Sequence, residues 1–105
     1  MTSKDFEIAK KLKDKIIETA QLVDFKVFGS RAKGVADEYS DLDIFIVVEQ
    51  LDKVLEEKIN EIAWEIGFEY SVYISPLIFT RNELENTPLR AAPIVKNISR
   101  EGVRI

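Results

Sequence analysis

The stretch Asp41-Leu42-Asp43-Ile44-Phe45-Ile46-Val47-Val48 is the strongest predicted strand in the chain. Its even-numbered positions are all apolar, whereas its odd-numbered positions begin with two aspartates and then become apolar too. Successive side chains of a strand point to opposite faces, so one face should be fully buried and the other polar only at its start. We therefore expect this strand to lie inside a sheet, with Asp41 and Asp43 together at one end of one face.

Apolar residues recur at helical spacing on both sides of this strand. They predict amphipathic helices over residues 3–22 and 51–66, the second closed by Gly67 as a C-terminal cap. Before the central strand we expect a short strand over 25–28, a brief helix over 31–35 and a loop over 36–39. After the second helix we expect a strand over 69–79, a helical turn over 82–85 and an edge strand over 103–105. A last helix precedes that edge strand; Pro93 either interrupts or starts it, and Gly102 ends it.

The alternation of helices and strands indicates an α/β fold (α+β in some schemes). Its helices are expected to pack on one face of a small sheet. About a dozen residues link the first two strands, the lower limit for a parallel crossover, so we expect a mixed sheet. The length fits one domain, and no repeat or linker divides it, so residues 1–105 are assigned to a single domain.

The composition narrows the chemistry that the chain can perform. Histidine and cysteine are both absent, which excludes a His base, a Ser-His triad, thiolate chemistry and His- or Cys-ligated zinc. The remaining carboxylates and hydroxyls suit hard cations such as magnesium. The net charge of −4 argues against a general nucleic-acid binder. The lack of cysteine and of a long apolar run indicates a cytoplasmic protein that does not enter the membrane.

Asp41 and Asp43 are the first candidate site. On a strand their side chains share a face, with roots roughly 6.6–6.8 Å apart. Carboxylates at that separation can converge on one cation or bridge two, and magnesium held in this way keeps positions open for phosphate oxygens. Taken alone, such a pair is common and is more often a solvated strand start than a metal site.

Gly29-Ser30 is the second candidate site, because it falls where a strand meets a short helix. Backbone N–H groups at a helix start favour an anion, and glycine allows phosphate to approach the backbone closely. Arg31 and Lys33 follow and are candidates to meet a triphosphate, although surface charges would have the same pattern. A phosphate site and a carboxylate pair on neighbouring elements are together far more specific than either alone.

The runs Gly29-Ser30-Arg31-Ala32-Lys33-Gly34 and Ser40-Asp41-Leu42-Asp43-Ile44 resemble the minimal nucleotidyltransferases of the DNA polymerase beta superfamily. The resemblance extends over most of the chain, including the closing residues 100–105. It implies the nucleotidyltransferase fold and transfer of a nucleoside monophosphate from a nucleoside triphosphate, with ATP expected, to a hydroxyl group. It also implies that Gly29 and Ser30 hold the triphosphate while Asp41 and Asp43 bind magnesium, as two ions in an active enzyme.

The same resemblance implies a partner. Members of this group often pair with an all-helical HEPN-type protein, and some pairs act as toxin and antitoxin, with the transferase modifying its partner. The hydroxyl acceptor is therefore expected on a partner protein. Nothing in the sequence decides whether the chain also forms a homo-oligomer.

The sequence departs from the family pattern at the third carboxylate, which the superfamily places on a later strand. Counting from Gly67 puts that position at Ser71, which carries no charge, while Glu69 lies two residues earlier on the same predicted strand face. A register shift or bulge could bring Glu69 into place. The alternative function is a catalytically weak or inactive nucleotide-binding antitoxin or regulatory subunit that acts by complex formation. A third alternative is an acidic pair that binds no ligand.

Overall fold

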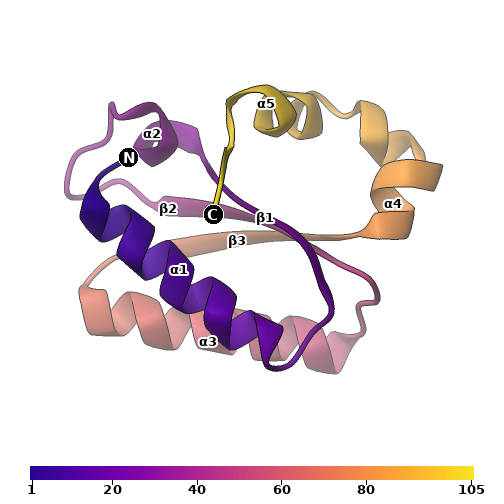
Figure 1. Cartoon of the computed structure of the whole chain (residues 1–105), viewed down its shortest axis with the longest axis horizontal. Helices are drawn as coiled ribbons and strands as arrows, with labels where there is room; N and C mark the ends of the chain where they lie inside the picture. Colours follow the sequence, from indigo (N-terminus) through magenta and orange to yellow (C-terminus); the bar gives the residue numbers. More distant parts are fainter.

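The sheet has the strand order β3-β2-β1-β4 in a computed structural model that describes all 105 residues (Figure 1). Its strands are β1 (Leu22–Phe28), β2 (Leu42–Val48), β3 (Ile74–Thr80) and β4 (Val103–Arg104). β2 is antiparallel to β1 and parallel to β3, and β4 is antiparallel to β1. The expected mixed sheet is confirmed. The short link between β1 and β2 therefore joins an antiparallel pair, which needs no crossover.

The helices are α1 (Ser3–Ile17), α2 (Gly29–Lys33), α3 (Lys53–Tyr70), α4 (Arg81–Asn86), the 3₁₀ helix η1 (Pro88–Ala91) and α5 (Pro93–Glu101). The first helix ends earlier than the predicted residue 22. The second ends later than the predicted residue 66, because Gly67 lies inside α3 and does not cap it. None of these helices is long and apolar enough to cross a membrane.

Gly67 has a packing role within α3. A Cβ at this position would lie 2.5 Å from the carbonyl oxygen of Val72, so only glycine lets the helix and the following chain approach this closely. The helix continues to Tyr70 and ends at Ser71, whose left-handed φ of 56° turns the chain toward β3. The predicted strand start at Glu69 is therefore wrong, and β3 begins only at Ile74.

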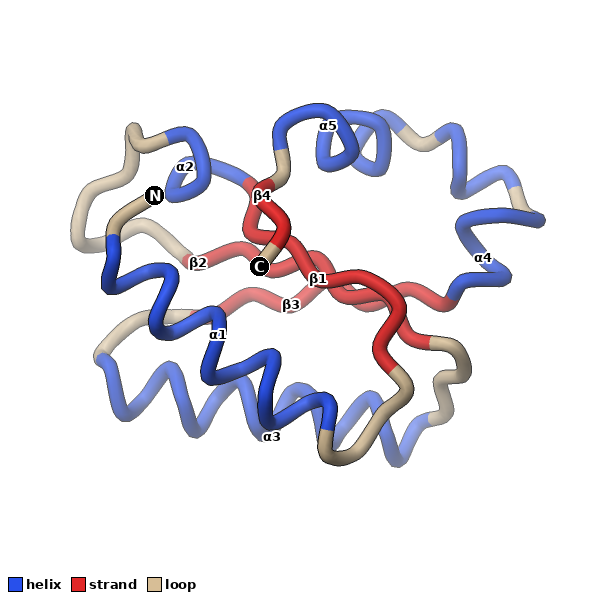
Figure 2. Tube along the Cα trace, viewed as in Figure 1, coloured by secondary structure: helices blue, strands red, loops and turns tan.

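β2 is the centre of the core and is buried on both faces, as its sequence pattern predicted. Its even-numbered side chains pack with α1 and α3 in the larger core (Leu42, Ile44, Ile46 and Val48). Phe45 and Val47 point to the other face, where they contact Phe79 of β3 and Ile98 of α5. The two long helices thus share one face, as expected, and α5 with α4 adds a smaller layer on the other side (Figure 2).

Candidate functional site

Asp41 and Asp43 lie at the start of β2, on the face that α5 partly covers farther along the strand. Asp41 is exposed and Asp43 is half-buried. Burial, and after it the negative charge of Asp41, raises the pKa of Asp43 above its usual range. Neither carboxylate forms an ion pair within the chain. The site therefore holds two like charges that a bound cation would neutralise.

Gly29 brings the phosphate motif against this carboxylate pair. Phe28, the last residue of β1, pairs with Asp43 of β2, so the next residue in the chain starts α2 beside the Asp43 side chain. Gly29 has a φ of +75°, and a Cβ on it would overlap Oδ2 of Asp43. No side chain caps the start of α2. The two sequence motifs thus meet in space, and the first N–H groups of a helix lie next to the acidic pair.

Arg31, a predicted nucleotide contact, forms several hydrogen bonds within the chain. Its Nη1 donates to Oδ1 of Asp5 at 2.8 Å, and both side chains are almost fully buried. Its Nε and Nη2 both donate to the carbonyl oxygen of Ser40, at 2.8 and 2.6 Å. The guanidinium therefore ties α2 to the start of α1 and to the residue that precedes Asp41, which positions both halves of the site.

Lys33 remains accessible. It forms an ion pair with Glu101 of α5 at 3.1 Å, but both side chains are about half exposed. Exposed pairs of this kind are weak, so a polyphosphate could compete for the ammonium group. Lys33 also lines a cleft of about 180 Å³ between α2 and α5, together with Gly29, Asn97 and Ile98.

The predicted third-carboxylate positions are not on β3. Glu69 lies in α3, where it accepts from Nζ of Lys11 at 2.8 and 2.9 Å, and Ser71 follows the end of that helix. The residue that pairs with Asp43 across the parallel ladder is Ser75. No cluster of three or more acidic, His or Cys side chains suited to a metal exists in the structure. The β3 residue that faces Asp43 is therefore Ser75, which carries no charge and lies four residues beyond Ser71.

The family comparison agrees with this geometry. Residues 7–105 match the family described as the nucleotidyltransferase domain. The chain belongs to this family. A candidate protein adenylyltransferase from Methanocaldococcus jannaschii is 39% identical over 56 residues, which are 52% of this chain and 57% of that protein. The matched residues thus span little more than half the length of this curated relative.

Solved structures agree on the fold. A candidate minimal nucleotidyltransferase superposes with a TM-score of 0.61 at 20% identity, and the match covers 100% of both chains. A toxin–antitoxin structure with AMP-PNP also gives a TM-score of 0.61, at 22% identity, over 93% of this chain and 69% of the other. At these identities the likeness confirms the nucleotidyltransferase fold, with its mixed sheet.

Removal of the Arg31 side chain should destabilise the protein. Arg31→Ala leaves the buried Asp5 carboxylate without its partner and frees the Ser40 carbonyl, so we expect unfolding to become easier by about 3 kcal/mol. Lys33→Ala, on the same short helix, removes only an exposed pair and should cost about 0.5 kcal/mol or less. Urea denaturation of both variants measures the difference. Equal midpoints would contradict the positioning role of Arg31.

Asp43 should give the metal-free protein a measurable pH dependence. The pKa of Asp43 is raised in the folded protein and returns toward the ordinary value of 3.8 on unfolding. In the pH window between these two values, the unfolded chain has lost a proton that the folded chain keeps. The free energy of unfolding should therefore fall as the pH rises through the window. Asp43→Asn should abolish this fall and raise the thermal midpoint at neutral pH. Glu38→Gln, which removes one negative charge from an exposed loop, is the matched control.

Proposed function

We propose that this protein transfers AMP from ATP to a hydroxyl group on a partner protein. The observation that carries the proposal is the contact of Gly29 with the Asp43 carboxylate, which places a helix start and an acidic pair in one site. The first can hold phosphate oxygens and the second a cation, and a magnesium–nucleotide complex needs both. Membership of the nucleotidyltransferase domain family supports this chemistry.

The carboxylate pair fits magnesium. Asp41 and Asp43 share one strand face, and their mutual repulsion contributes to the raised pKa of Asp43. Magnesium binds through one or two carboxylates and completes its coordination with water and substrate phosphates, so these two side chains would hold one ion. When bound, the ion supplies charge neutralisation at the phosphates. A second ion has less support, because Ser75 stands where a further carboxylate would face Asp43.

Residues of α2 are proposed to hold the triphosphate. Gly29 and Ser30 present the first N–H groups of the helix, and Lys33 supplies a charge once released from Glu101. The acceptor oxygen attacks the α-phosphorus, the bond to pyrophosphate breaks, and AMP becomes esterified to the acceptor. The acceptor proton passes to solvent, because Ser75 provides no base. Arg31 acts indirectly, by holding the backbone of Ser40 in front of Asp41.

The acceptor is proposed to be a protein of the helical HEPN type, with this chain as the antitoxin of the pair. A relative that is named as a candidate protein adenylyltransferase supports a protein acceptor, and a solved neighbour that is a toxin–antitoxin structure with AMP-PNP supports the antitoxin role. The HEPN type rests on the resemblance of the sequence motifs alone. We further propose a cytoplasmic location, where ATP and magnesium are abundant, which also accords with the absence of cysteine.

The second candidate function is an antitoxin or regulatory subunit that binds nucleotide but transfers it slowly or not at all. Ser75 favours it, since two carboxylates and a helix start suffice to bind a magnesium–nucleotide complex, whereas nucleophile activation suffers most without the third. In that case neutralisation of the partner would depend on complex formation alone.

Transfer can be measured directly. The protein is incubated with magnesium, ATP labelled on the α-phosphate and the product of the adjacent gene, and label on that product is expected. Asp43→Asn should lower the rate by at least about a hundredfold, because it removes a charge that holds the metal. Bound nucleotide without any transfer would reject the proposed activity in favour of the binding function, and Glu38→Gln again controls for charge.

Ser75→Asp tests the missing carboxylate. Adjacent strands lie about 4.8 Å apart, so an aspartate here would face Asp43 across the ladder. If activation of the nucleophile limits turnover, the variant should transfer AMP about tenfold faster or more and bind magnesium more tightly. Ser75→Asn, which has the same shape without the charge, should give neither gain. A Ser75→Asp variant that is folded and no faster would show that the third carboxylate is not what this site lacks.

A further inference from the structure

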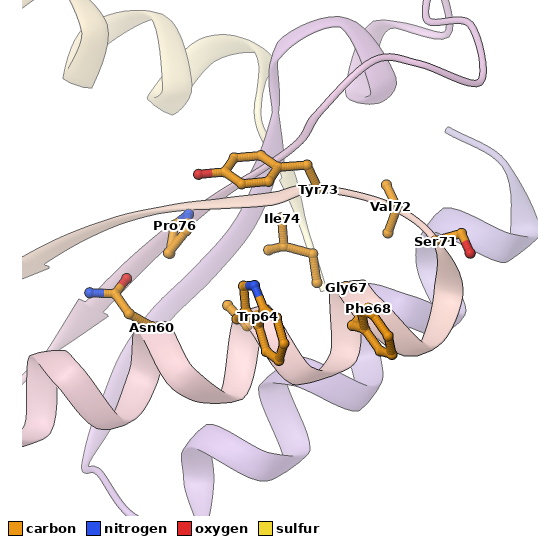
Figure 3. A pocket seen from close by; sticks show the side chains of 10 residues that line it. Asn60, Trp64, Gly67, Phe68, Ser71, Val72, Tyr73, Ile74 and Pro76 are labelled. Atoms are coloured by element: carbon orange, nitrogen blue, oxygen red, sulfur yellow. The ribbon is translucent and has the colours of Figure 1, made fainter.

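A groove runs along the outer edge of the sheet, between α3 and β3 (Figure 3). It has a volume of about 650 Å³. Gly67 and Ile74 form its floor, and its sides include Trp64, Phe68, Tyr73 and Pro76. Because Gly67 lacks a side chain, α3 lies close to the chain entering β3. Trp64 and Phe68 project from α3 on one side of this contact, and Tyr73 projects from the strand side (Figure 3). We call this feature the aromatic groove.

Three aromatic side chains of the groove are mostly exposed to solvent and contribute little to the core of the chain. Trp64, Phe68 and Tyr73 are 65%, 76% and 66% exposed. Trp64 and Phe68, one helical turn apart, stack with ring centroids 5.5 Å apart and planes at 17° (Figure 3). Stacked rings form a rigid apolar surface, and exposed aromatic anchors of this kind carry much of the binding energy in protein interfaces.

Acidic residues extend the same helix surface. Glu57, Glu61 and Glu65 follow one another at every fourth position of α3 and are all exposed. None of them forms an ion pair. Like charges spaced four residues apart on a helix repel one another. Cationic side chains of a partner would remove that repulsion, so the groove is complementary to an apolar surface flanked by Lys or Arg.

Two features decide the kind of occupant. β3 is an edge strand, but Pro76 in its middle lacks an N–H group and so weakens the edge as a template for an added strand. A second copy of this chain would bring its own row of glutamates against the first. A helix from a different protein, with basic residues beside an apolar stripe, meets neither obstacle.

We propose that the aromatic groove docks an amphipathic helix of a partner protein, with the apolar face of that helix on Trp64 and Phe68 and its Lys or Arg residues beside the α3 glutamates. Docking does not require transfer activity, so this inference stands apart from the proposed function. Tyr73 extends the groove toward the site, because its carbonyl accepts from the N–H of Leu42, the residue between the two aspartates. A docked partner would therefore lie beside β3, the strand next to β2.

The test uses Trp64, the single tryptophan of the chain, as the reporter. Two helical peptides share a leucine face, and one carries lysine where the other carries glutamate. We expect the lysine peptide to shift Trp64 fluorescence to shorter wavelength and to bind less tightly as salt is added. The glutamate peptide should leave the emission unchanged. No shift with the lysine peptide, or an equal shift with both, would overturn the proposal.

Matched variants locate the binding surface. Phe68→Ala keeps the reporter and should weaken the lysine peptide by about tenfold or more. Phe6→Ala removes an aromatic side chain that is 47% exposed on α1 and should leave the affinity unchanged. Glu57→Lys with Glu61→Lys tests the charge on residues exposed to solvent and should also weaken binding. Equal affinities for Phe68→Ala and Phe6→Ala would reject the groove, as would sedimentation showing a dimer that Phe68→Ala dissociates.

Discussion

The pairing of Phe28 with Asp43 at the end of the β1–β2 ladder is the constraint on which the site depends. It sets where β1 ends relative to β2 and therefore where α2 begins. Gly29 follows at once with a positive φ, and its lack of a side chain leaves room for the Asp43 carboxylate. Any larger residue would have to displace either the helix or the carboxylate, and the start of α2 would then move away from the acidic pair.

The Arg31 guanidinium adds a second restraint to this arrangement. It joins three segments: the first turn of α1 through Asp5, α2 itself, and the loop that ends at Ser40. Asp5 also accepts from the backbone N–H of Thr2 and so helps to cap α1. One ion pair thus connects a helix cap with the backbone in front of Asp41.

The sequence pattern predicted what depends on local alternation, and it failed where distant segments meet. The polar start of β2 and its burial on both faces followed from the order of its residues. The sequence predicts too early an end for α3 because glycine is typical of helix C-caps. In the structure, Gly67 lies inside the helix and allows its close approach to the carbonyl oxygen of Val72. The same local pattern placed Glu69 and Ser71 on a strand, whereas the residue that faces Asp43 from β3 is set by the register of β2 with β3 and is Ser75. The ion pair of Arg31 could not be predicted from the local pattern, because Asp5, its partner, lies 26 residues earlier.

The thin second layer has a consequence for motion. Ile98 is the only buried residue of α5, and it rests on a cluster of just three other buried side chains (Phe45, Val47 and Phe79). A segment with so few buried contacts exchanges its amide hydrogens by opening locally, at a lower free energy than the unfolding of the whole domain. α5 also forms one wall of the cleft beside Gly29. This wall of the cleft is therefore weakly anchored, and local opening of α5 would widen the cleft beside Gly29 while β2 and the acidic pair stay in place.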